Sequence, residues 1–233
     1  MSKNSLFHTH NPIIIFDVET TGLSADVDEV IELGAIMLVR KPTNTIVKEE
    51  LSCLIKLPES KRLSAEITKL TGITSEMLET QGLVQQDAAN MFADMVRRSN
   101  PGRILFIAHN AQFDLGFLTA FLCKNGCNDL VSQFDVIDTL TILKDRKQYP
   151  HKLSDAITYY NLGNRAKNSH RALDDVNALF AVLSAMSKEA DDLPRYVNLL
   201  GYNPKYGVSG ERIPHVVYMP QGYDSATKLY EQT

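Results

Sequence analysis

The order of strand-like and helix-like segments is the feature that most constrains the fold of this chain. Three segments rich in apolar and β-branched residues come first, at 13–18, 29–39 and 50–57. Helical patterns then alternate with two further strand-like runs, at 103–108 and 134–137. Short connections favour an antiparallel meander for the first three strands, which would place the first strand inside the sheet. The pattern as a whole predicts an α/β fold with a mixed sheet.

Predicted helices account for much of the chain after residue 63. Two short ones between residues 64 and 78 are interrupted at Thr71-Gly72, and others are expected at 85–98, 113–124, 139–144, 153–160 and 171–188. We divide the chain into a flexible N-terminal tail (1–11), one main domain (12–188) and a C-terminal extension (189–233). The extension holds four prolines and one strand-like run at 213–219, and we expect it to pack on the domain.

Composition narrows the class of protein. The 233 residues are 44% hydrophobic and 22% charged, enough apolar residues for one substantial core. A net charge of −4 argues against a broad basic face, so a bound polynucleotide would be held locally by a metal site and a few side chains. Three cysteines, an odd number, fit a reducing compartment better than a disulfide framework. With neither a secretory signal nor an apolar stretch near the ~20 residues of a membrane helix, we expect a cytoplasmic protein with no membrane partner.

Two carboxylates stand at the end of the first predicted strand. Asp17 and Glu19 are two residues apart, so both point to the same face of the sheet. Such a pair is common and by itself more often marks a solvated strand end. Here Thr20-Thr21-Gly22 follows, a tight turn that would leave backbone N–H groups and hydroxyls beside the carboxylates, where a terminal phosphate or ribose could bind.

A second polar segment follows the fourth strand. His109 and Asn110 come at the strand end, and Asp114 falls in the first turn of the next helix. Capping of the helix by Asn110, with Asp114 favouring the helix dipole, explains part of this pattern. It leaves open why two polar residues crowd a strand end, which is where ligand sites gather in α/β sheets.

The third segment, 169–175, leads into the longest predicted helix. Asp174 and Asp175 cannot face the same way on a helix, so one of them would point inward toward the sheet. An inward carboxylate is costly unless it is paired or bound to a metal ion. His170 alone is explained as well by a solvated position before the helix.

Four acidic residues from these segments would then converge: Asp17, Glu19, Asp114 and Asp175. Two carboxylates ~4 Å apart repel by about 4 kcal/mol at an effective dielectric constant of ~20, so four together need divalent cations. Oxygen ligands select hard ions, which predicts Mg²⁺, or Mn²⁺ in its place, rather than zinc. Two such ions ~3.5–4 Å apart activate a water molecule and stabilise the leaving oxygen in phosphodiester cleavage.

The three segments resemble, in order, the motifs of the DEDD superfamily of 3′→5′ exonucleases. The match covers residues 12–187, with 16–22 similar to the first motif, 109–114 to the second and 170–175 to the third. The resemblance is to the histidine branch, which includes the proofreading epsilon subunit of bacterial DNA polymerase III, ribonuclease T and oligoribonuclease. The tyrosine branch has a Tyr four residues before the last acid, where this chain has Arg171. The resemblance implies a ribonuclease H-like fold, with a mixed five-stranded sheet flanked by helices.

The resemblance also implies a role for each site residue. Asp17 would bridge two divalent cations. Glu19 and Asp175 would complete one metal site, and Asp114 would serve the other. His170 would accept the proton of the attacking water, for which the ordinary histidine pKa of ~6.5 is suited. The pocket for the 3′-terminal nucleotide would be lined by Thr20, Thr21, Gly22, Leu23, His109, Asn110 and Phe113. Three other acids are assigned structural or solvated positions: Asp135, Asp138 (a helix cap) and Asp174.

The leading functional hypothesis is an enzyme that releases nucleoside monophosphates from a single-stranded 3′ end, DNA rather than RNA. A DNA polymerase or another replication or repair protein is the expected partner, and the oligomeric state stays open. An exoribonuclease that trims RNA 3′ ends is the alternative, which the sequence discriminates poorly. A non-catalytic polymerase-associated binding subunit should lack at least one of the acids, and this chain lacks none. A strand-transfer or endonucleolytic enzyme usually has a different acid set and a more basic surface.

Overall fold

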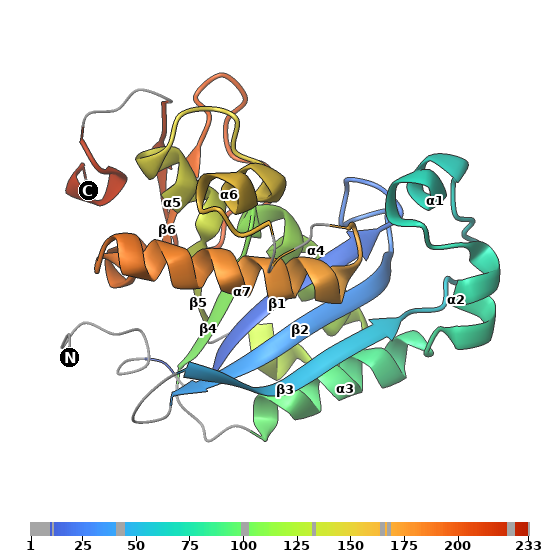
Figure 1. Cartoon of the computed structure of the whole chain (residues 1–233). Coiled ribbons are helices and arrows are strands. Elements are labelled where there is room, and N and C mark those ends of the chain that lie inside the picture. Colours follow the sequence, from blue (N-terminus) through green and yellow to red (C-terminus); the bar gives the residue numbers. More distant parts are fainter. Residues whose placement is uncertain are drawn as a thin grey trace.

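A central sheet organises the computed structural model, which describes residues 10, 12–40, 45–98, 103–131, 134–163, 166, 169–222 and 227–232. Its five strands lie in the order β3-β2-β1-β4-β5 (Figure 1). The predicted antiparallel meander is formed by β1 (Ile13–Thr20), β2 (Val30–Arg40) and β3 (Thr45–Leu54). The parallel part of the sheet is formed by β1, β4 (Ile104–Ala108) and β5 (Phe134–Asp138). The mixed α/β sheet and the internal position of the first strand are therefore confirmed.

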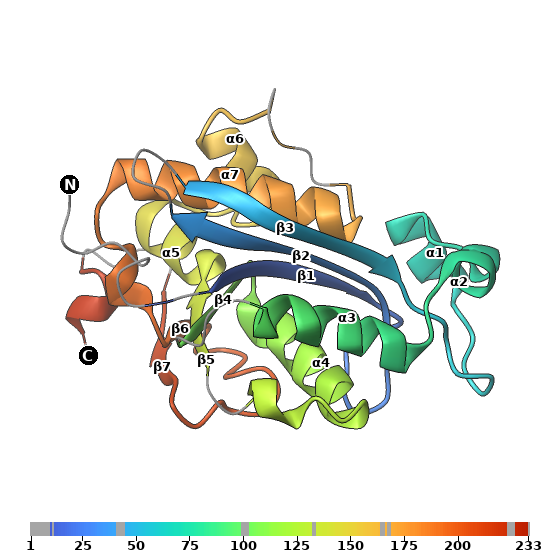
Figure 2. The same ribbon diagram turned by 90° about the horizontal axis from the view of Figure 1, so that it is seen from below.

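Helices cover both faces of the sheet (Figure 2). One face carries α3 (Gln85–Arg97) and α4 (Ala111–Lys124). The other carries α5 (Thr139–Arg146), α6 (Leu153–Tyr159) and α7 (Ala172–Glu189). Side chains of β1 point alternately to the two faces of the sheet. Ile14, Phe16 and Val18 pack with α3 and α4 on one face. Ile13 and Ile15 pack with α7 on the other face. The row of Ile13 and Ile15 continues into the first pair of acids, which therefore faces α7.

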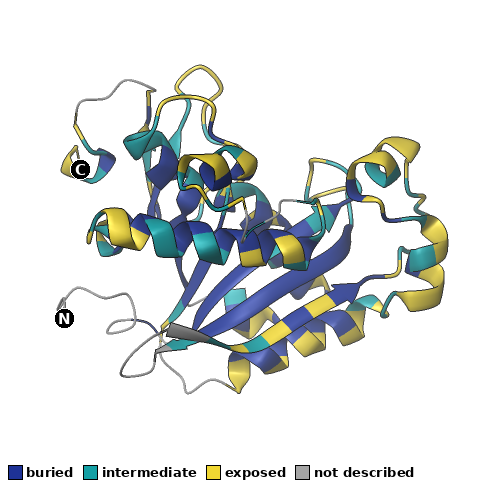
Figure 3. Cartoon of the chain, in the orientation of Figure 1, coloured by how far each residue is buried: buried dark blue, intermediate teal, exposed yellow. Residues whose placement is uncertain are grey.

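The helices α1 (Ala65–Thr71) and α2 (Ser75–Gln81) lie beyond the end of β3. Side chains cap both of them, because Ser64 accepts the Ile67 N–H group and Thr74 accepts the Met77 N–H group. Gly72 ends α1 with a φ of 73°, a left-handed conformation that glycine adopts without strain. This is the interruption that the sequence predicted at Thr71-Gly72. Figure 3 shows how much of α1 and α2 is exposed, while the strands beneath α7 are buried.

Some strand boundaries differ from the prediction, because pairing with a neighbouring strand determines where a strand begins and ends. β3 begins at Thr45, five residues before the predicted start, because its pairing with β2 continues past a register shift at Met37/Leu38. The run predicted at 213–219 forms a shorter strand, β7 (Val217–Pro220). It pairs in parallel with β6 (Leu199–Tyr202), which the sequence did not predict. Within the described residues, short 3-10 helices lie at η2 (Asn128–Val131), η3 (Leu193–Tyr196) and η4 (Leu229–Glu231).

Residues after 189 pack against β5 and α5. Asn198 accepts the Val136 N–H group at 3.0 Å, and its amide donates to the buried carboxylate of Asp135. That carboxylate also binds Arg103 and His10, so its structural role is clear and it is not solvated. His10 belongs to the predicted N-terminal tail but is buried; the rest of residues 1–11 lies outside the described part of the chain. No helix among the described residues is both long and apolar enough to span a membrane.

Candidate active site

The carboxyl end of β1 positions the first two acids. Asp17 lies opposite Gly34 and Glu19 lies opposite Glu32 in the antiparallel pair with β2. Both acids are partly buried on the α7 side of the sheet. After Glu19 the pairing shifts register, and the chain leaves the sheet at Thr20.

The turn after Glu19 is held by its own polar groups. Thr20 Oγ1 donates to the Gly22 carbonyl at 2.6 Å, and Thr21 Oγ1 donates to Asp28 at 3.3 Å. A Cβ atom on Gly22 would overlap the Asp28 carboxylate, so glycine allows this loop to close. Leu23 stands at its tip with 88% of its surface exposed. Both hydroxyl protons are therefore used within the loop, and contacts of Thr20 and Thr21 with a terminal nucleotide stay predictions.

The start of α4 positions the third acid. Asp138 at the end of β5 accepts the N–H groups of Asn110 (2.9 Å), Ala111 (3.2 Å) and Leu140 (3.0 Å). One carboxylate thus caps two helices, which confirms and extends the capping role predicted for Asp138. Asn110 itself has a φ of 74° and makes no side-chain cap bond, so capping by Asn110 is wrong. Capping by Asp138 starts α4 two residues early and leaves the buried Asp114 in its first turn.

Two predicted substrate residues flank this helix start. His109 is held on both ring nitrogens, by Thr139 Oγ1 at 3.0 Å and the His151 carbonyl at 2.9 Å. Burial lowers the pKa of His109, and its ring ties the end of β4 to the region after α5. Phe113 is partly buried against Phe117, with ring centroids 5.0 Å apart. Contacts of His109 and Phe113 with a nucleotide stay predictions.

The start of α7 positions the last acid and the histidine. Asp175 is buried and accepts the Ser169 N–H group at 2.9 Å, while Asp174 is exposed and accepts the Ser169 hydroxyl at 2.6 Å. One acid therefore faces inward, as the helix geometry predicted. His170 is exposed and has a φ of 54°, a left-handed conformation that is uncommon outside glycine.

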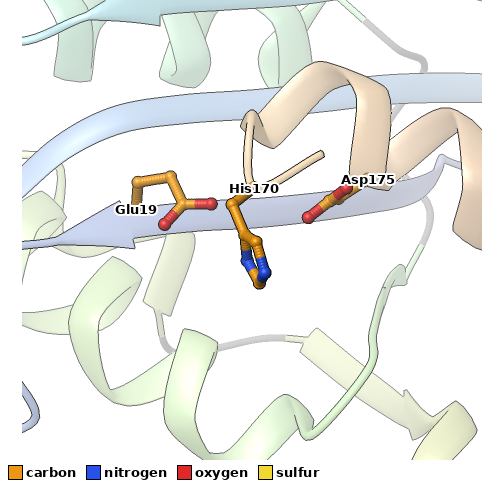
Figure 4. A group of neighbouring side chains, drawn as sticks. All are labelled: Glu19, His170 and Asp175. Carbon is orange, nitrogen blue, oxygen red and sulfur yellow. The ribbon is translucent and has the colours of Figure 1, made fainter. Parts of the chain in front are cut away.

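Glu19, His170 and Asp175 form a group that could hold a metal ion. One ligand atom from each lies within 4.8 Å of the other two. In Figure 4 the two carboxylates flank the imidazole ring, one from β1 and one from the start of α7. The sequence predicted this proximity from the first and third motifs, in which Glu19 and His170 are 151 positions apart.

Excess negative charge dominates the electrostatics of the site. Burial raises the pKa of Asp17 well above its ordinary value, and four carboxylates raise it further: Asp114, Glu19, Asp175 and Glu32, in decreasing order of effect. Burial, followed by the charges of Asp175 and Glu32, raises the pKa of Glu19 to about 7, although Arg171 lowers it. Burial likewise raises the pKa of Asp114, against the backbone N–H groups of Val18 and Asp114, which lower it. The charges of Asp114, Glu19 and Asp175 thus all act on Asp17, and such an oxygen-rich, negatively charged ligand set fits divalent cations.

Three residues that support this site were not predicted as site residues: Glu32, Arg171 and Gly34. Glu32 is buried at 1% exposure and accepts the Arg171 guanidinium at 2.8–3.1 Å, as well as the Ala172 N–H group at 3.0 Å. It thereby fixes the residue after His170 and the first turn of α7. An acid in a strand of otherwise mostly apolar residues, two positions before Gly34 and four before the buried Ile36, was the available sequence signal.

Gly34 is the third supporting residue, opposite Asp17. A Cβ atom there would lie 2.5 Å from the Ala172 carbonyl carbon and 2.6 Å from the Leu173 nitrogen. The backbone of α7 can approach β2 only because glycine leaves this space. This approach brings Asp175 within reach of Asp17. The close contact gave no sequence signal, because glycine in a strand also marks bulges and bends.

We expect Glu32→Gln to lower both stability and activity. Gln keeps the shape of the side chain but gives up the charged pair with Arg171, so a loss of about 1–3 kcal/mol in unfolding free energy is expected. Displacement of the turn around His170 should also lower kcat. Denaturant unfolding measures the first effect and steady-state hydrolysis the second. The matched control is Glu49→Gln, which removes an exposed pair with Arg98 on β3 and should cost less than about 1 kcal/mol; equal losses in the two variants would contradict the positioning role.

Without metal, stability should fall as pH rises from about 5 to 8. The folded-state pKa of Glu19 lies above its value in an unfolded chain, so the penalty is absent at low pH and grows as pH rises toward and through about 7. Mg²⁺ bound by the carboxylates would offset this penalty. Melting temperatures in EDTA and in Mg²⁺ should therefore diverge with pH, and Glu19→Gln should reduce the divergence. An equal effect of Mg²⁺ at both ends of this range would refute the electrostatic explanation.

Comparison with known proteins gives the family. A profile of the RNase T family, described as exonuclease, matches residues 14–183. The DNA polymerase III PolC-type of Latilactobacillus sakei subsp. sakei (strain 23K) is 33% identical over 227 residues, covering 94% of this chain and 14% of the relative. That of Bacillus subtilis (strain 168) is 37% identical over 183 residues, covering 76% of this chain and 11% of the relative. The chain thus spans a small part of the length of these polymerases.

Solved structures show the same fold. E. coli Exonuclease I in complex with a dA16 oligonucleotide has a TM-score of 0.68 at 16% identity, covering 80% of this chain and 43% of that one. Exonuclease X in complex with 5′ overhanging duplex DNA has a TM-score of 0.55 at 17% identity, covering 77% and 93%. The ribonuclease H-like fold implied by the motifs is confirmed. With the family profile, the polymerase relatives and all four motif acids together, the chain belongs to the DEDD-type family of 3′→5′ exonucleases.

Proposed function

We propose that this chain removes nucleoside monophosphates from the 3′ end of single-stranded DNA by hydrolysis with two divalent cations. The observation that carries the proposal is the proximity of the acids: burial, and then repulsion by neighbouring carboxylates, raises the pKa of Asp17 and Glu19. A site of this charge is stable at neutral pH when cations occupy it. A non-catalytic binding subunit would not require several buried carboxylates close together, an arrangement that destabilises the fold in the absence of cations.

Each side chain has a proposed role. Asp17 would contribute to both cation sites; Glu19 and Asp175 would complete one site, and Asp114 would serve the other. Mg²⁺ at these positions supplies Lewis acidity toward the scissile phosphate and lowers the pKa of a bound water. His170 accepts the proton of the attacking water. Its exposed position beside Glu19 and Asp175 suits a base that must reach solvent and substrate.

Assignment to the histidine branch is part of the proposal. The two tyrosines nearest in sequence to the third motif hydrogen bond elsewhere: Tyr159 donates to the Gln148 carbonyl at 2.8 Å and Tyr160 to Glu189 at 2.6 Å. His170, in contrast, lies at the acids. These contacts favour structural roles for the two tyrosines, and the position of His170 favours its role as the base.

DNA is the proposed substrate for two reasons. The relatives that match most of this chain are DNA polymerases, and a structure with the same fold was solved with a DNA oligonucleotide. A DNA polymerase, or another replication or repair protein, is the proposed partner, and a cytoplasmic location is proposed with it.

The test compares DNA and RNA of one sequence. Single-stranded oligonucleotides labelled at the 5′ end are incubated with the purified chain and Mg²⁺ or Mn²⁺. We expect a ladder of DNA products shortened from the 3′ end and release of nucleoside 5′-monophosphates, with slower cleavage of RNA. The Asp17→Asn protein, purified in parallel, controls for contaminating nucleases. Faster cleavage of RNA would favour the exoribonuclease alternative, and no cleavage of either with either metal would refute the enzyme function.

A further inference from the structure

A cavity of about 710 Å³ lies between α4, the loop after β1 and the C-terminal extension. Leu23 and Phe113, both predicted to border the 3′-terminal nucleotide, are part of its wall. Its size lies in the ~300–1,000 Å³ range of ligand-binding pockets. The opposite wall is formed by residues 209–215, which lie outside the segment 14–183 that matches the exonuclease family.

Specific contacts hold this second wall against α4. Gln112, in the first turn of α4, donates to the Glu211 carbonyl and accepts the Tyr218 hydroxyl at 2.7 Å. The same hydroxyl accepts the Ile213 N–H group at 3.0 Å. The Arg212 guanidinium lies 5.1 Å from the centre of the Tyr218 ring. The extension is therefore fixed at the cavity by groups adjacent in sequence to Phe113 and Asp114.

Gly116 keeps the floor of the cavity open. It lies in the middle of α4, where glycine costs about 0.5–1 kcal/mol relative to alanine. A Cβ atom at this position would meet nothing nearer than Ala25 Cβ at 4.0 Å, so packing does not require glycine. The missing side chain does leave the helix backbone accessible beside the aromatic pair Phe113–Phe117. Glycine at this position lowers the stability of α4 without a packing reason, which suggests that the cavity binds a ligand.

We propose that this cavity binds nucleobases of the strand upstream of the 3′-terminal nucleotide, which makes the C-terminal extension half of the single-strand binding site. The inference rests on the proposed exonuclease function. Leu23 and Phe113 connect the cavity directly to the proposed site of the terminal nucleotide. Bases stack on aromatic faces without regard to sequence, as the partly exposed ring of Phe113 would allow.

Charge favours bases rather than phosphates inside the cavity. Asp26 and Glu211 border it and would repel a phosphate, whereas neutral bases meet no such barrier. Arg212 is exposed at the wall, where its guanidinium can contact the sugar–phosphate backbone as it passes outside. The strand would thus run along the wall with its bases turned inward.

The decisive variant is Gly116→Leu, which fills the cavity from a helical position with open space. We expect KM for a single-stranded oligothymidylate to rise about 10-fold or more, within the ~5- to 150-fold contribution of one stacked base. Hydrolysis of the p-nitrophenyl ester of thymidine 5′-monophosphate, which occupies only the terminal position, should be unchanged. Gly116→Ala is the matched control, since its Cβ fits, and should raise the melting temperature with little change in KM. Arg212→Ala should raise KM for the oligonucleotide, whereas Lys205→Ala, outside the cavity, should not.

The possible results distinguish failure of the cavity proposal from failure of the proposed exonuclease function. If wild-type protein hydrolyses both substrates and Gly116→Leu changes neither KM, the cavity does not hold the strand. If Gly116→Leu impairs the ester and the oligonucleotide equally, the cavity belongs to the terminal nucleotide and the inference is wrong. If wild-type protein hydrolyses neither substrate, the proposed function fails. Fluorescence anisotropy of a labelled oligothymidylate in EDTA then tests the cavity alone, and equal affinity of wild type and Gly116→Leu would overturn it.

Discussion

Asp17→Asn should abolish nearly all hydrolysis of a 3′ end and, in metal-free buffer, raise the melting temperature. Asn keeps the size of the side chain but cannot bridge two cations, so a loss in kcat on the order of 10⁴-fold or more is expected, as for other residues central to a catalytic unit. Stability should change in the opposite direction. Burial and four neighbouring carboxylates raise the pKa of Asp17, and a neutral amide removes this repulsion from the folded state.

Lower activity together with higher metal-free stability is the result expected for an acid whose role is to bind metal ions. Rates on a single-stranded oligonucleotide, titration with Mn²⁺ and melting curves in EDTA measure the three quantities. Asp174→Asn is the matched control, because Asp174 is an exposed acid beside Asp175 and should leave activity near that of the wild type. Near-normal turnover of Asp17→Asn would refute the bridging role. A lower melting temperature in EDTA would show instead that the Asp17 carboxylate stabilises the fold.

The site acids could be predicted because each leaves a local signal. Strand alternation places Asp17 and Glu19 on one face, and helical geometry separates Asp175 from Asp174. These signals are properties of the chain within a few residues. The convergence itself follows from topology, since β1 and β4 are parallel neighbours and the acids lie at β1's carboxyl end and at the starts of α4 and α7.

Residues that support the site could not be predicted in the same way. Glu32 binds Arg171 across 139 positions of the sequence, and Gly34 matters only because α7 packs on it. Asp138 was predicted to cap one helix, but its second capped helix, α4, starts 27 residues earlier in the chain. Such contacts depend on how complete elements pack, and each partner by itself has an ordinary local pattern.

The C-terminal extension shows the same limit more strongly. Its attachment depends on pairs such as Gln112 with Tyr218 and Asn198 with Asp135, which join it to α4 and β5. Its scattered prolines and short strands carry no periodic pattern, so the sequence predicted one strand and missed the parallel partner. The cavity that it forms with α4 is therefore visible only in the folded chain.

His170→Asn should lower kcat by about 10²–10⁴-fold and leave Mn²⁺ affinity unchanged. Asn tolerates the left-handed backbone that His170 adopts, so this variant removes the imidazole without adding strain, whereas His170→Ala would change both. The contacts on either side, Ser169 with Asp175 and Arg171 with Glu32, should hold the backbone in place.

Metal titration decides between the two roles open to His170, because its ring lies within 4.8 Å of ligand atoms of Glu19 and Asp175. If His170 is the base, calorimetric titration with Mn²⁺ gives the same affinity for wild type and His170→Asn while the rate falls. If His170 is a metal ligand, affinity falls together with rate, and higher Mn²⁺ concentration restores part of the activity. The first result would support assignment to the histidine branch. The second would leave the site without a proposed base, because Tyr160, the tyrosine nearest to the third motif in sequence, donates its hydroxyl to Glu189 instead. The exposed, left-handed position of His170 favours the first, because a base must exchange its proton with solvent after each turnover.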